Sequence, residues 1–522
     1  MSWIVLGEDK GKIKLVSKRP GKNETPGLLP KGSFLTVETD KKTKFILRVD
    51  ESLQHEPYSP TPMIVDMDLS SLNEDRKCQN IVLAYRVKDI SDRADGKIDF
   101  IPPQTIARRS SQSEIDIALG SYSEGPRVFL ATIHSGQNQI LVDNNLNYIT
   151  TRLPEEMFFH QMIICGATGS GKTVAMKYLA QYFVEELKGA VLAVNVKDVD
   201  FLKMDKPSRT NNDQVKNEWK ALGGKPQGIK NTTIYYPANT SLNFSQGVSR
   251  EICKKITLRV GEIDPESLIG LLENISDVAA QNLPDIFRYW QSNIAKKGST
   301  FLDFVKYFNE AEDNQRRYST LNIRGDESSI QLHVGTFQNI GRNLNSAVEF
   351  FDNEEADSID EKDILEHGKL SVINVVGQKG VQFGSVLLRH LLKRIVIAKD
   401  QSLSDVPILI IIDEVHQFYN TDDARAALGY LDTICRTGRS KKIGVIFSSQ
   451  NPGDIPRGLS SVVNSKIYFK SSEPSATKYL GLAGEEMESL RKGFAVASIH
   501  ELSQLRILKF PLSYAGVIDK ED

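Results

Sequence analysis

The chain has 522 residues, of which 40% are hydrophobic and 25% charged, and its formal net charge at pH 7 is −2. This balance is ordinary for a globular protein of about three folding units, and it excludes both a disordered chain and a general electrostatic attraction to nucleic acid. Four widely spaced cysteines, an N-terminus without a signal-peptide pattern and the lack of a long apolar stretch predict a cytoplasmic protein with no membrane segment, disulfide or cysteine-bound metal.

The first 150 residues contain short runs of β-favouring residues, separated by turn-forming Pro, Gly, Asn and Asp. Four such runs cover 34–39, 44–49, 80–87 and 127–133. Short strands with turn residues at this spacing are typical of a small barrel or sandwich. We therefore expect an N-terminal β-domain at residues 1–150.

Apolar strands and helical patterns alternate beyond this β-domain, which is typical of a parallel sheet with crossover helices. Strand-like runs lie at 190–196 and 370–376, and the second of these precedes a long helical pattern at 381–398. These elements predict an α/β core that is divided into residues 151–244 and residues 351–522.

A helical segment separates the two parts of the core at residues 245–350. Asp264-Pro-Glu places proline in the first turn of a helix, and apolar residues follow at helical spacing: Leu268, Leu271, Leu272 and Ile275. Thr300 and Asp303 form a pattern like a capping box ahead of another helix. These signals predict a helical insertion within the core.

A glycine-rich run follows the apolar strand 162–165 and leads into a helical pattern. It consists of Gly166, Ala167, Thr168, Gly169, Ser170, Gly171, Lys172 and Thr173. Glycines allow backbone N–H groups to approach a polyphosphate, and the helix N-terminus adds a partial positive charge. Lys172 is expected to contact the β- and γ-phosphates, and the Thr173 hydroxyl to hold Mg²⁺. Because a strand and a helix flank the run, a simple glycine turn is the weaker alternative, and the chain is predicted to bind ATP or GTP.

Two adjacent carboxylates end the most apolar strand of the core. Asp413 and Glu414 follow five consecutive aliphatic residues at 408–412. Ligands bind at the carboxyl ends of parallel strands, so both acids are expected at that edge of the sheet. Asp413 is predicted to hold the Mg²⁺ shell, and Glu414 to accept a proton from the water that attacks the γ-phosphate. Taken alone, a strand followed by a polar loop would explain the same residues.

Three further polar residues are candidates for catalysis. Gln450 follows the strand 443–447, where an amide can sense the γ-phosphate or orient water, and a turn-forming polar cluster before Pro452 is the alternative. Arg436 and Arg439 lie between these two strands and would stabilise a transferring phosphoryl group if a neighbouring subunit supplied them. An exposed basic helix end explains the two arginines equally well.

In combination and in order, these motifs resemble those of the HerA family of the FtsK–HerA superfamily. The matching stretches are 166–173, 194–200, 370–398, 413–416, 436–439 and 449–452. The resemblance covers about residues 125–515 and implies a RecA-like ATPase core with a helical insertion, active sites between subunits and an N-terminal small β-barrel. The family's functional positions match Lys172, Thr173, Asp413, Glu414 and Gln450, and its arginine-bearing segment matches Arg436 or Arg439.

Proteins of that family form hexameric rings that hydrolyse ATP and move along double-stranded DNA. The resemblance therefore implies ATP and Mg²⁺, a homo-hexamer, and a separate effector, because no nuclease cluster is evident outside the core. Archaeal relatives act with the NurA nuclease in DNA end processing, and several bacterial relatives act with sirtuin-like or nuclease effectors in antiphage defence. A ring scaffold that gates an effector without translocation is the alternative. A secretion or conjugation motor is disfavoured by the lack of membrane segments.

Two positions depart from the family pattern. Relatives often have Asp and Gly after the second core strand, whereas this chain has Asn195 and Asp198 there. Archaeal relatives often have Arg-His before the strand that precedes the glycine-rich run, whereas this chain has His160-Gln161. The catalytic acid of the first segment is therefore open, and any role of the missing arginine must pass to another residue.

Contacts with DNA are expected from two basic segments. Residues 203–230 hold seven basic and three acidic residues, and a flexible loop of this charge can contact phosphates in the pore of a ring. An ordinary solvated loop is the alternative. Lys379 is a second candidate of the same kind. Neither segment predicts base-specific recognition, which a translocase does not need.

Overall fold

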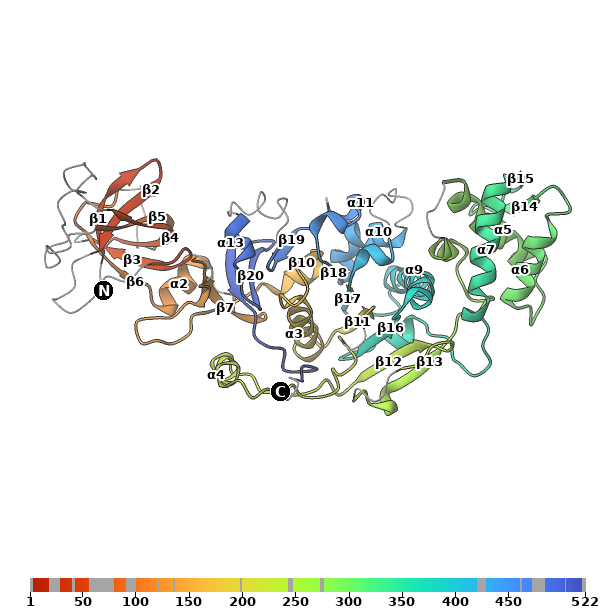
Figure 1. The fold of residues 1–522 in the computed structure, drawn as a ribbon, viewed down its shortest axis with the longest axis horizontal. Helices are drawn as coiled ribbons and strands as arrows, with labels where there is room; N and C mark the ends of the chain where they lie inside the picture. Colours follow the sequence, from red (N-terminus) through yellow and green to blue (C-terminus); the bar gives the residue numbers. More distant parts are fainter. Residues whose placement is uncertain are drawn as a thin grey trace, which may run out of the picture. The chain divides into compact units, whose positions relative to one another are not determined.

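The computed structural model divides the chain into two compact units (Figure 1). One unit comprises Met1–Glu155 with Thr477–Pro511, and the other comprises Glu156–Ala476 with Leu512–Asp522. The C-terminal part of the chain therefore contributes to both units. The described residues are 3–17, 29–39, 43–55, 79–90, 100–120, 122–134, 137–197, 200–242, 247–272, 277–419, 429–460, 462–471, 484–502 and 504–518.

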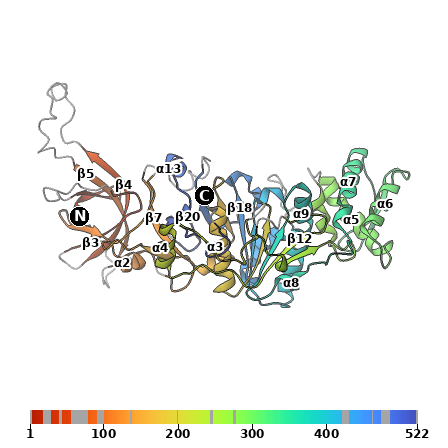
Figure 2. The ribbon, with the colours of Figure 1, turned by 60° about the horizontal axis from the view of Figure 1, so that its bottom comes forward.

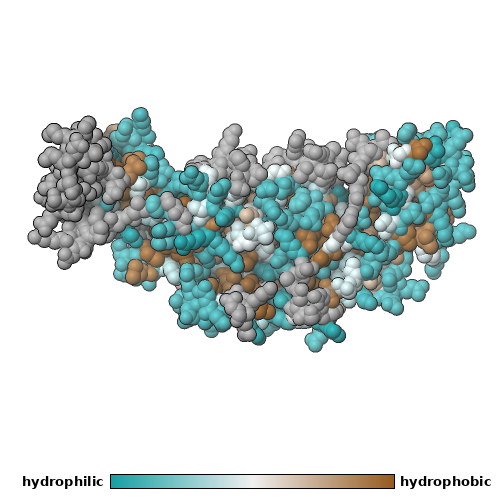
Figure 3. All heavy atoms as spheres, viewed as in Figure 1, coloured by the Kyte–Doolittle hydropathy of each residue, from teal (hydrophilic) through white to brown (hydrophobic). Residues whose placement is uncertain are grey.

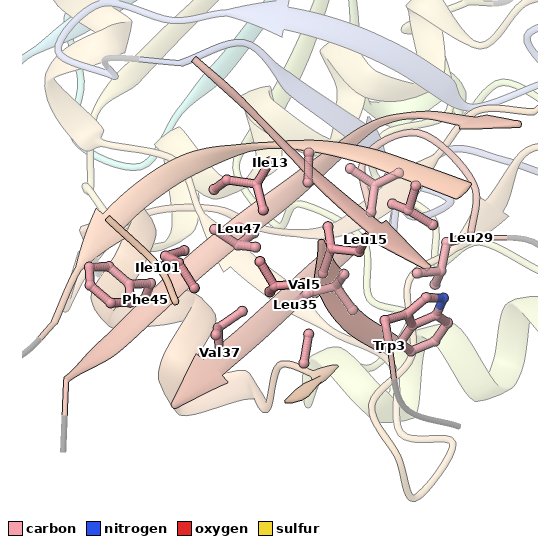
Figure 4. Packing of buried hydrophobic residues seen from close by; sticks show 14 residues of the cluster. Trp3, Val5, Ile13, Leu15, Leu29, Leu35, Val37, Phe45, Leu47 and Ile101 are labelled. Atoms are coloured by element: carbon pink, nitrogen blue, oxygen red, sulfur yellow. The ribbon is translucent and has the colours of Figure 1, made fainter. Parts of the chain in front are cut away.

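The first unit contains a closed antiparallel barrel with the strand order β1-β2-β5-β4-β3-β6. The strands are β1 Trp3–Asp9, β2 Lys12–Ser17, β3 Phe34–Glu38, β4 Lys44–His55, β5 Gln79–Asp89 and β6 Ile106–Arg109. Alternate side chains of β1 and β2 are buried, and Figure 4 shows Val5, Ile13 and Leu15 packed with Leu35 and Leu47 inside the barrel. Burying each such side chain stabilises the fold by about 1.5–3 kcal/mol. The predicted N-terminal barrel is confirmed.

An antiparallel set of strands in the first unit joins its N-terminal and C-terminal segments. Its order is β20-β21-β7-β8, and β9 pairs with β7. The strands are β7 Arg127–Thr132, β8 Gln139–Ile140, β9 Thr150–Arg152, β20 Phe494–Ser498 and β21 Arg506–Lys509, and the short helix α13 covers Gly484–Glu488. The strand-like run at 127–133 therefore lies in this sheet and not in the barrel.

Helix α2 (Gln112–Leu119) is held against the barrel by the contacts of one buried carboxylate, that of Glu114. Ser111 and Glu114 form a capping box at its N-terminus. Glu114 also accepts hydrogen bonds from the Arg108 guanidinium at 2.6 and 2.9 Å, and its Oε1 lies 2.6 Å from Lys44 Nζ. Burial works against the charge of Glu114, but the two cations outweigh burial and hold its pKa well below the usual range.

We expect Glu114→Gln to destabilise the first unit by about 3 kcal/mol at pH 7, because the variant breaks a buried ion pair. A carboxylate with a depressed folded-state pKa stabilises the fold above its unfolded pKa, and this contribution is lost as the pH falls through the folded pKa. In urea unfolding, the difference in the free energy of unfolding between wild type and variant should therefore become smaller below about pH 4. Glu124→Gln, at an exposed position, is the control. A difference that does not change with pH would contradict this account.

The second unit is built on a parallel sheet with the order β13-β12-β16-β11-β17-β18-β10-β19. The strands are β10 Met162–Cys165, β11 Ala190–Asn195, β12 Thr232–Pro237, β13 Cys253–Ile256, β16 Leu370–Asn374, β17 Ile408–Ile412, β18 Ile443–Ser449 and β19 Ser465–Tyr468. Both β11 and β17 are buried along their whole length. Central strands covered on both faces have such continuous apolar sequences. The predicted α/β core is confirmed.

Helices connect these strands in the order expected for crossover connections. Helix α3 packs against β11 and β17, and α10 packs against β18 (Figure 1). The helices of the sheet region are α3 Lys172–Glu185, α4 Asp213–Leu222, α8 Glu361–Ile364, α9 Gln378–Asp400, α10 Tyr430–Thr437 and α11 Arg457–Ser460.

A mainly helical insertion lies between β13 and β16, and its helices α5, α6 and α7 lie together in Figures 1 and 2. Its elements are the 3₁₀ helix η5 Pro265–Leu271, α5 Asp277–Asn293, α6 Phe301–Glu310, the hairpin β14 Arg317–Leu321 and β15 Glu327–Gln331, α7 Val334–Ala347 and η6 Val348–Phe350. The core of the insertion is aromatic, because the ring centroid of Phe304 lies 4.8 Å from Phe287 and 5.3 Å from Trp290.

Two sequence signals in the insertion have different outcomes. The capping box of Thr300 and Asp303 is present at the start of α6. The helix expected after Asp264 is a 3₁₀ helix instead. Leu268 and Leu271 are both buried there, and a 3₁₀ helix already places residues i and i+3 on the same side.

The described surface is mostly hydrophilic on the face drawn in Figure 3. Among the described helices, none combines the length and the apolar character needed to cross a bilayer. The 23-residue helix α9 is long enough, but it carries charged residues along its length, including Arg389, Lys393 and Arg394.

Candidate nucleotide-binding site

The glycine-rich run connects β10 to α3, as predicted. Its glycines have backbone angles in the left-handed region, with φ of 152° at Gly166, 77° at Gly169 and 113° at Gly171. Gly166 has no room for a side chain, because a Cβ there would lie 2.7 Å from Phe469 Cβ. The Ala167 N–H donates to Lys470 O at 2.7 Å. The segment after β19 therefore fixes the loop, and the loop leads into the first turn of α3, whose N–H groups have no partner within the helix.

Lys172 and Thr173 begin α3 and contact neighbouring parts of the site. Lys172 Nζ donates to the backbone oxygens of Gly166 and Ala167, so the ammonium lies over the loop. Burial lowers the pKa of Lys172. Thr173 Oγ1 lies 3.5 Å from Asp200 Oδ2. Thr173, which is predicted to hold Mg²⁺, thus lies beside Asp200, an acid of the stretch 194–200 to which the sequence assigned no role.

The two acids that follow β17 are almost completely buried, with exposed fractions of 0% for Asp413 and 1% for Glu414. Glu414 adopts a left-handed backbone with φ of 48°, and its N–H donates to Asp413 Oδ1 at 3.1 Å. Asp413 Oδ2 and Glu414 Oε2 make no hydrogen bond to the described residues. Burial raises the pKa of Asp413. Buried carboxylate oxygens without hydrogen bonds fit a bound cation, because a cation would offset their lost hydration.

The carboxylate of Glu414 is contacted from two other strands. Lys197, two residues after β11, places Nζ 2.8 Å from Glu414 Oε1 and 3.9 Å from Asp413 Oδ2. Gln450, directly after β18, places Nε2 3.4 Å from the same Glu414 Oε1. Strand β18 lies between β10 and β17, so Gln450 emerges between the glycine-rich run and the acids. The structure therefore brings together Lys172, Thr173, Asp413, Glu414 and Gln450 at one edge of the sheet.

Neither arginine candidate joins this group within the protomer. Arg436 and Arg439 are exposed at the end of α10 and in the following turn. Arg436 pairs with Asp432 of its own helix at 2.9 Å. In the described part of the chain, neither guanidinium has a hydrogen bond or ion pair with the predicted nucleotide-binding residues. A role across a subunit interface stays a prediction.

The positions that depart from the family pattern have structural contacts. Asn195 is buried, and its Nδ2 donates to Asn374 Oδ1 at 2.8 Å, while Asp198 lies outside the described residues. Gln161, directly before β10, makes hydrogen bonds to β18 and α10, and its Oε1 accepts from Val445 N at 2.8 Å. Its Nε2 donates to Ile434 O at 3.2 Å, so both ends of the amide are occupied by backbone.

The basic segments proposed for DNA contact are more ordered than the sequence suggested. Within residues 203–230, α4 replaces the expected flexible loop, since Trp219 is buried and its indole donates to Leu512 O at 2.8 Å. Lys216 and Lys220 of α4 remain exposed. Lys379 lies in the first turn of α9 and pairs with Glu349 at 2.6 Å.

Comparison with known proteins agrees with this geometry. Residues 143–395 match the family model described as the central domain of helicase HerA. Residues 143–395 of this chain are therefore similar to the HerA central domain. A probable DNA double-strand break repair helicase HerA from Methanocaldococcus jannaschii is 30% identical over 179 residues, which are 28% of this chain and 35% of the relative. The DNA double-strand break repair helicase HerA of Saccharolobus solfataricus is 23% identical over 361 residues, 67% of this chain and 62% of the relative.

The chain thus spans between about a third and three fifths of these HerA relatives. Among solved structures, VirB4 of Thermoanaerobacter pseudethanolicus matches 75% of this chain and 98% of its own with 13% identity and a TM-score of 0.44.

We expect Gly166→Ala to lower the thermal unfolding midpoint of the second unit, because the new Cβ would collide with Phe469. Gly377→Ala is the matched control, since Gly377 also has a positive φ of 86° but nothing within 4 Å of the added Cβ. The decrease in the unfolding midpoint should exceed that of the control by roughly 4 °C, which corresponds to a cost of about 1–2 kcal/mol for overpacking. Equal shifts for both variants would show that the loop is not held against the segment after β19.

Proposed function

We propose that this chain is an ATP-hydrolysing motor that acts on double-stranded DNA as a homo-hexamer. The observation that carries the proposal is the convergence of the glycine-rich loop, two buried acids and Gln450 at the carboxyl edge of one parallel sheet. The similarity of residues 143–395 to the HerA central domain supports the assignment, and the relatives are named as DNA double-strand break repair helicases. A cytoplasmic location is part of the same proposal.

The side chains have distinct roles in this proposal. Lys172 leaves the backbone oxygens of its own loop to contact the phosphates of ATP. Thr173 and Asp413 hold Mg²⁺, which supplies positive charge against the phosphate oxygens when bound. Glu414 accepts the proton of the attacking water, and Gln450, which already contacts Glu414, orients that water.

The partner of this motor is a separate effector, either a nuclease in DNA end processing or an effector in antiphage defence. The family resemblance supports a separate partner. The described units contain the barrel, the antiparallel strands of the first unit and the core that is similar to the HerA central domain. A ring scaffold that hydrolyses ATP without moving on DNA is the second candidate, and the DNA dependence of hydrolysis separates the two.

ATP hydrolysis should be stimulated by linear duplex DNA, and the stimulation should fall steeply between about 50 and 200 mM salt, since phosphate contacts release counterions. Lys172→Ala and Glu414→Gln should each lower kcat by about 100-fold or more. The measurement is steady-state phosphate release with and without DNA, with Lys12→Met in the barrel as the control. A rate that is indifferent to DNA would contradict the motor and favour the scaffold.

Mixing inactive variants tests whether Arg436 or Arg439 acts on the neighbouring active site. Arg436→Ala and Arg439→Ala should each be inactive alone if that arginine is required. In an equimolar mixture with Glu414→Gln, about one interface in four combines an intact glutamate with an intact arginine, so ATPase activity should partly return. No recovery for either arginine variant would contradict a role across the interface.

A further inference from the structure

Lys197 lies where the loop after β11 meets the acids after β17. The two strands are adjacent and parallel, with Val194 opposite Ile412, so the residues that follow them lie side by side. The Lys197 side chain is 39% exposed, whereas Asp413 and Glu414 are 0% and 1% exposed. Its ammonium therefore lies on the open side of the two carboxylates.

The backbone of Lys197 is fixed, although its side chain is long and flexible. Asn195 Nδ2 donates to Lys197 O at 2.6 Å and to Asn374 Oδ1 at 2.8 Å. Asn195 and Asn374 end the neighbouring strands β11 and β16 in register. The four-carbon stem can thus move its charge from one partner to another while the main chain stays in place.

The same segment also faces the glycine-rich loop. Asp200, three residues after Lys197, contacts the Thr173 hydroxyl. Burial is the main cause of the lowered pKa of Lys172, and the charge of Lys197 lowers it further. Partial burial works against the charge of Lys197, but Asp413 and Glu414 outweigh it and raise its pKa.

We propose that Lys197 is the triphosphate sensor of this site: it holds the Glu414 carboxylate in the nucleotide-free protomer and exchanges it for the γ-phosphate when ATP binds. A carboxylate offers one negative charge, whereas the terminal phosphate of ATP offers more charge and more acceptor oxygens. The exchange frees Glu414 Oε1 to accept a proton from water. Lys197 is thus a positioning residue for Glu414, and this inference rests on the proposed ATPase function.

The test compares dissociation constants for ATPγS and ADP in the presence of Mg²⁺. Lys197→Met should weaken ATPγS binding by about tenfold or more, as expected for a lost hydrogen bond to a charged group, and leave ADP binding within about twofold. Unchanged ADP binding also shows that the variant is folded. Lys197→Arg should retain most of the preference for ATPγS. Lys12→Met is the matched control, because Lys12 is similarly exposed, at 48%, and also pairs with a carboxylate, Asp50.

Glu414→Gln supplies the second arm of the experiment. Removing the competing carboxylate should tighten ATPγS binding, and this gain should vanish in the double variant Lys197→Met/Glu414→Gln. A gain that persists in the double variant would overturn the exchange, as would an equal effect of Lys197→Met on both nucleotides. Failure of the wild type to bind either nucleotide would instead overturn the proposed function itself.

Discussion

The parallel register of the central strands is the constraint on which the site depends. Ile412 of β17 lies opposite both Val194 of β11 and Phe447 of β18, and Phe447 lies opposite Ile163 of β10. Four strands therefore end at the same edge of the sheet. The glycine-rich run, the lysine after β11, the acids after β17 and the glutamine after β18 meet there, although they are far apart in the chain. A shift of one residue in any of these strands would turn its side chains to the opposite face.

The strand ends fix the positions of the charged residues, but the negative charges of the site are only partly offset by its lysines. Two carboxylates are buried at the end of β17, and each keeps one oxygen without a hydrogen bond to the described residues. Glu414 also has a left-handed backbone, which costs a non-glycine residue about 1–2 kcal/mol. Lys197 offsets part of the negative charge, and Lys172 is occupied by its own loop. The arrangement is suited to ligands that bring both phosphate and a cation.

The sequence predicted the parts of the fold and of the site that depend on local pattern. The strand, glycine run and helix around Lys172 are such a pattern, as is the apolar strand before Asp413. Lys197 and Asp200 lie in the matching stretch 194–200, but the sequence assigned them no role, because their proximity to the acids and to Thr173 depends on which strands are neighbours. The helix α4 was taken for a loop because the burial of Trp219 depends on the distant residue Leu512. The sequence did not predict the hairpin β14–β15, because its strands, Arg317–Leu321 and Glu327–Gln331, are mostly polar and lack an apolar strand pattern.

The structure of the full chain with Mg²⁺ and ATPγS is the most direct test of the central claim, which is that the strand ends form a single nucleotide site. The account predicts the triphosphate over Gly166–Thr173, the metal between Thr173 and Asp413, and Glu414 separated from Lys197. A nucleotide bound elsewhere, or one bound at the loop with Asp413 and Glu414 remote from it, would contradict the account.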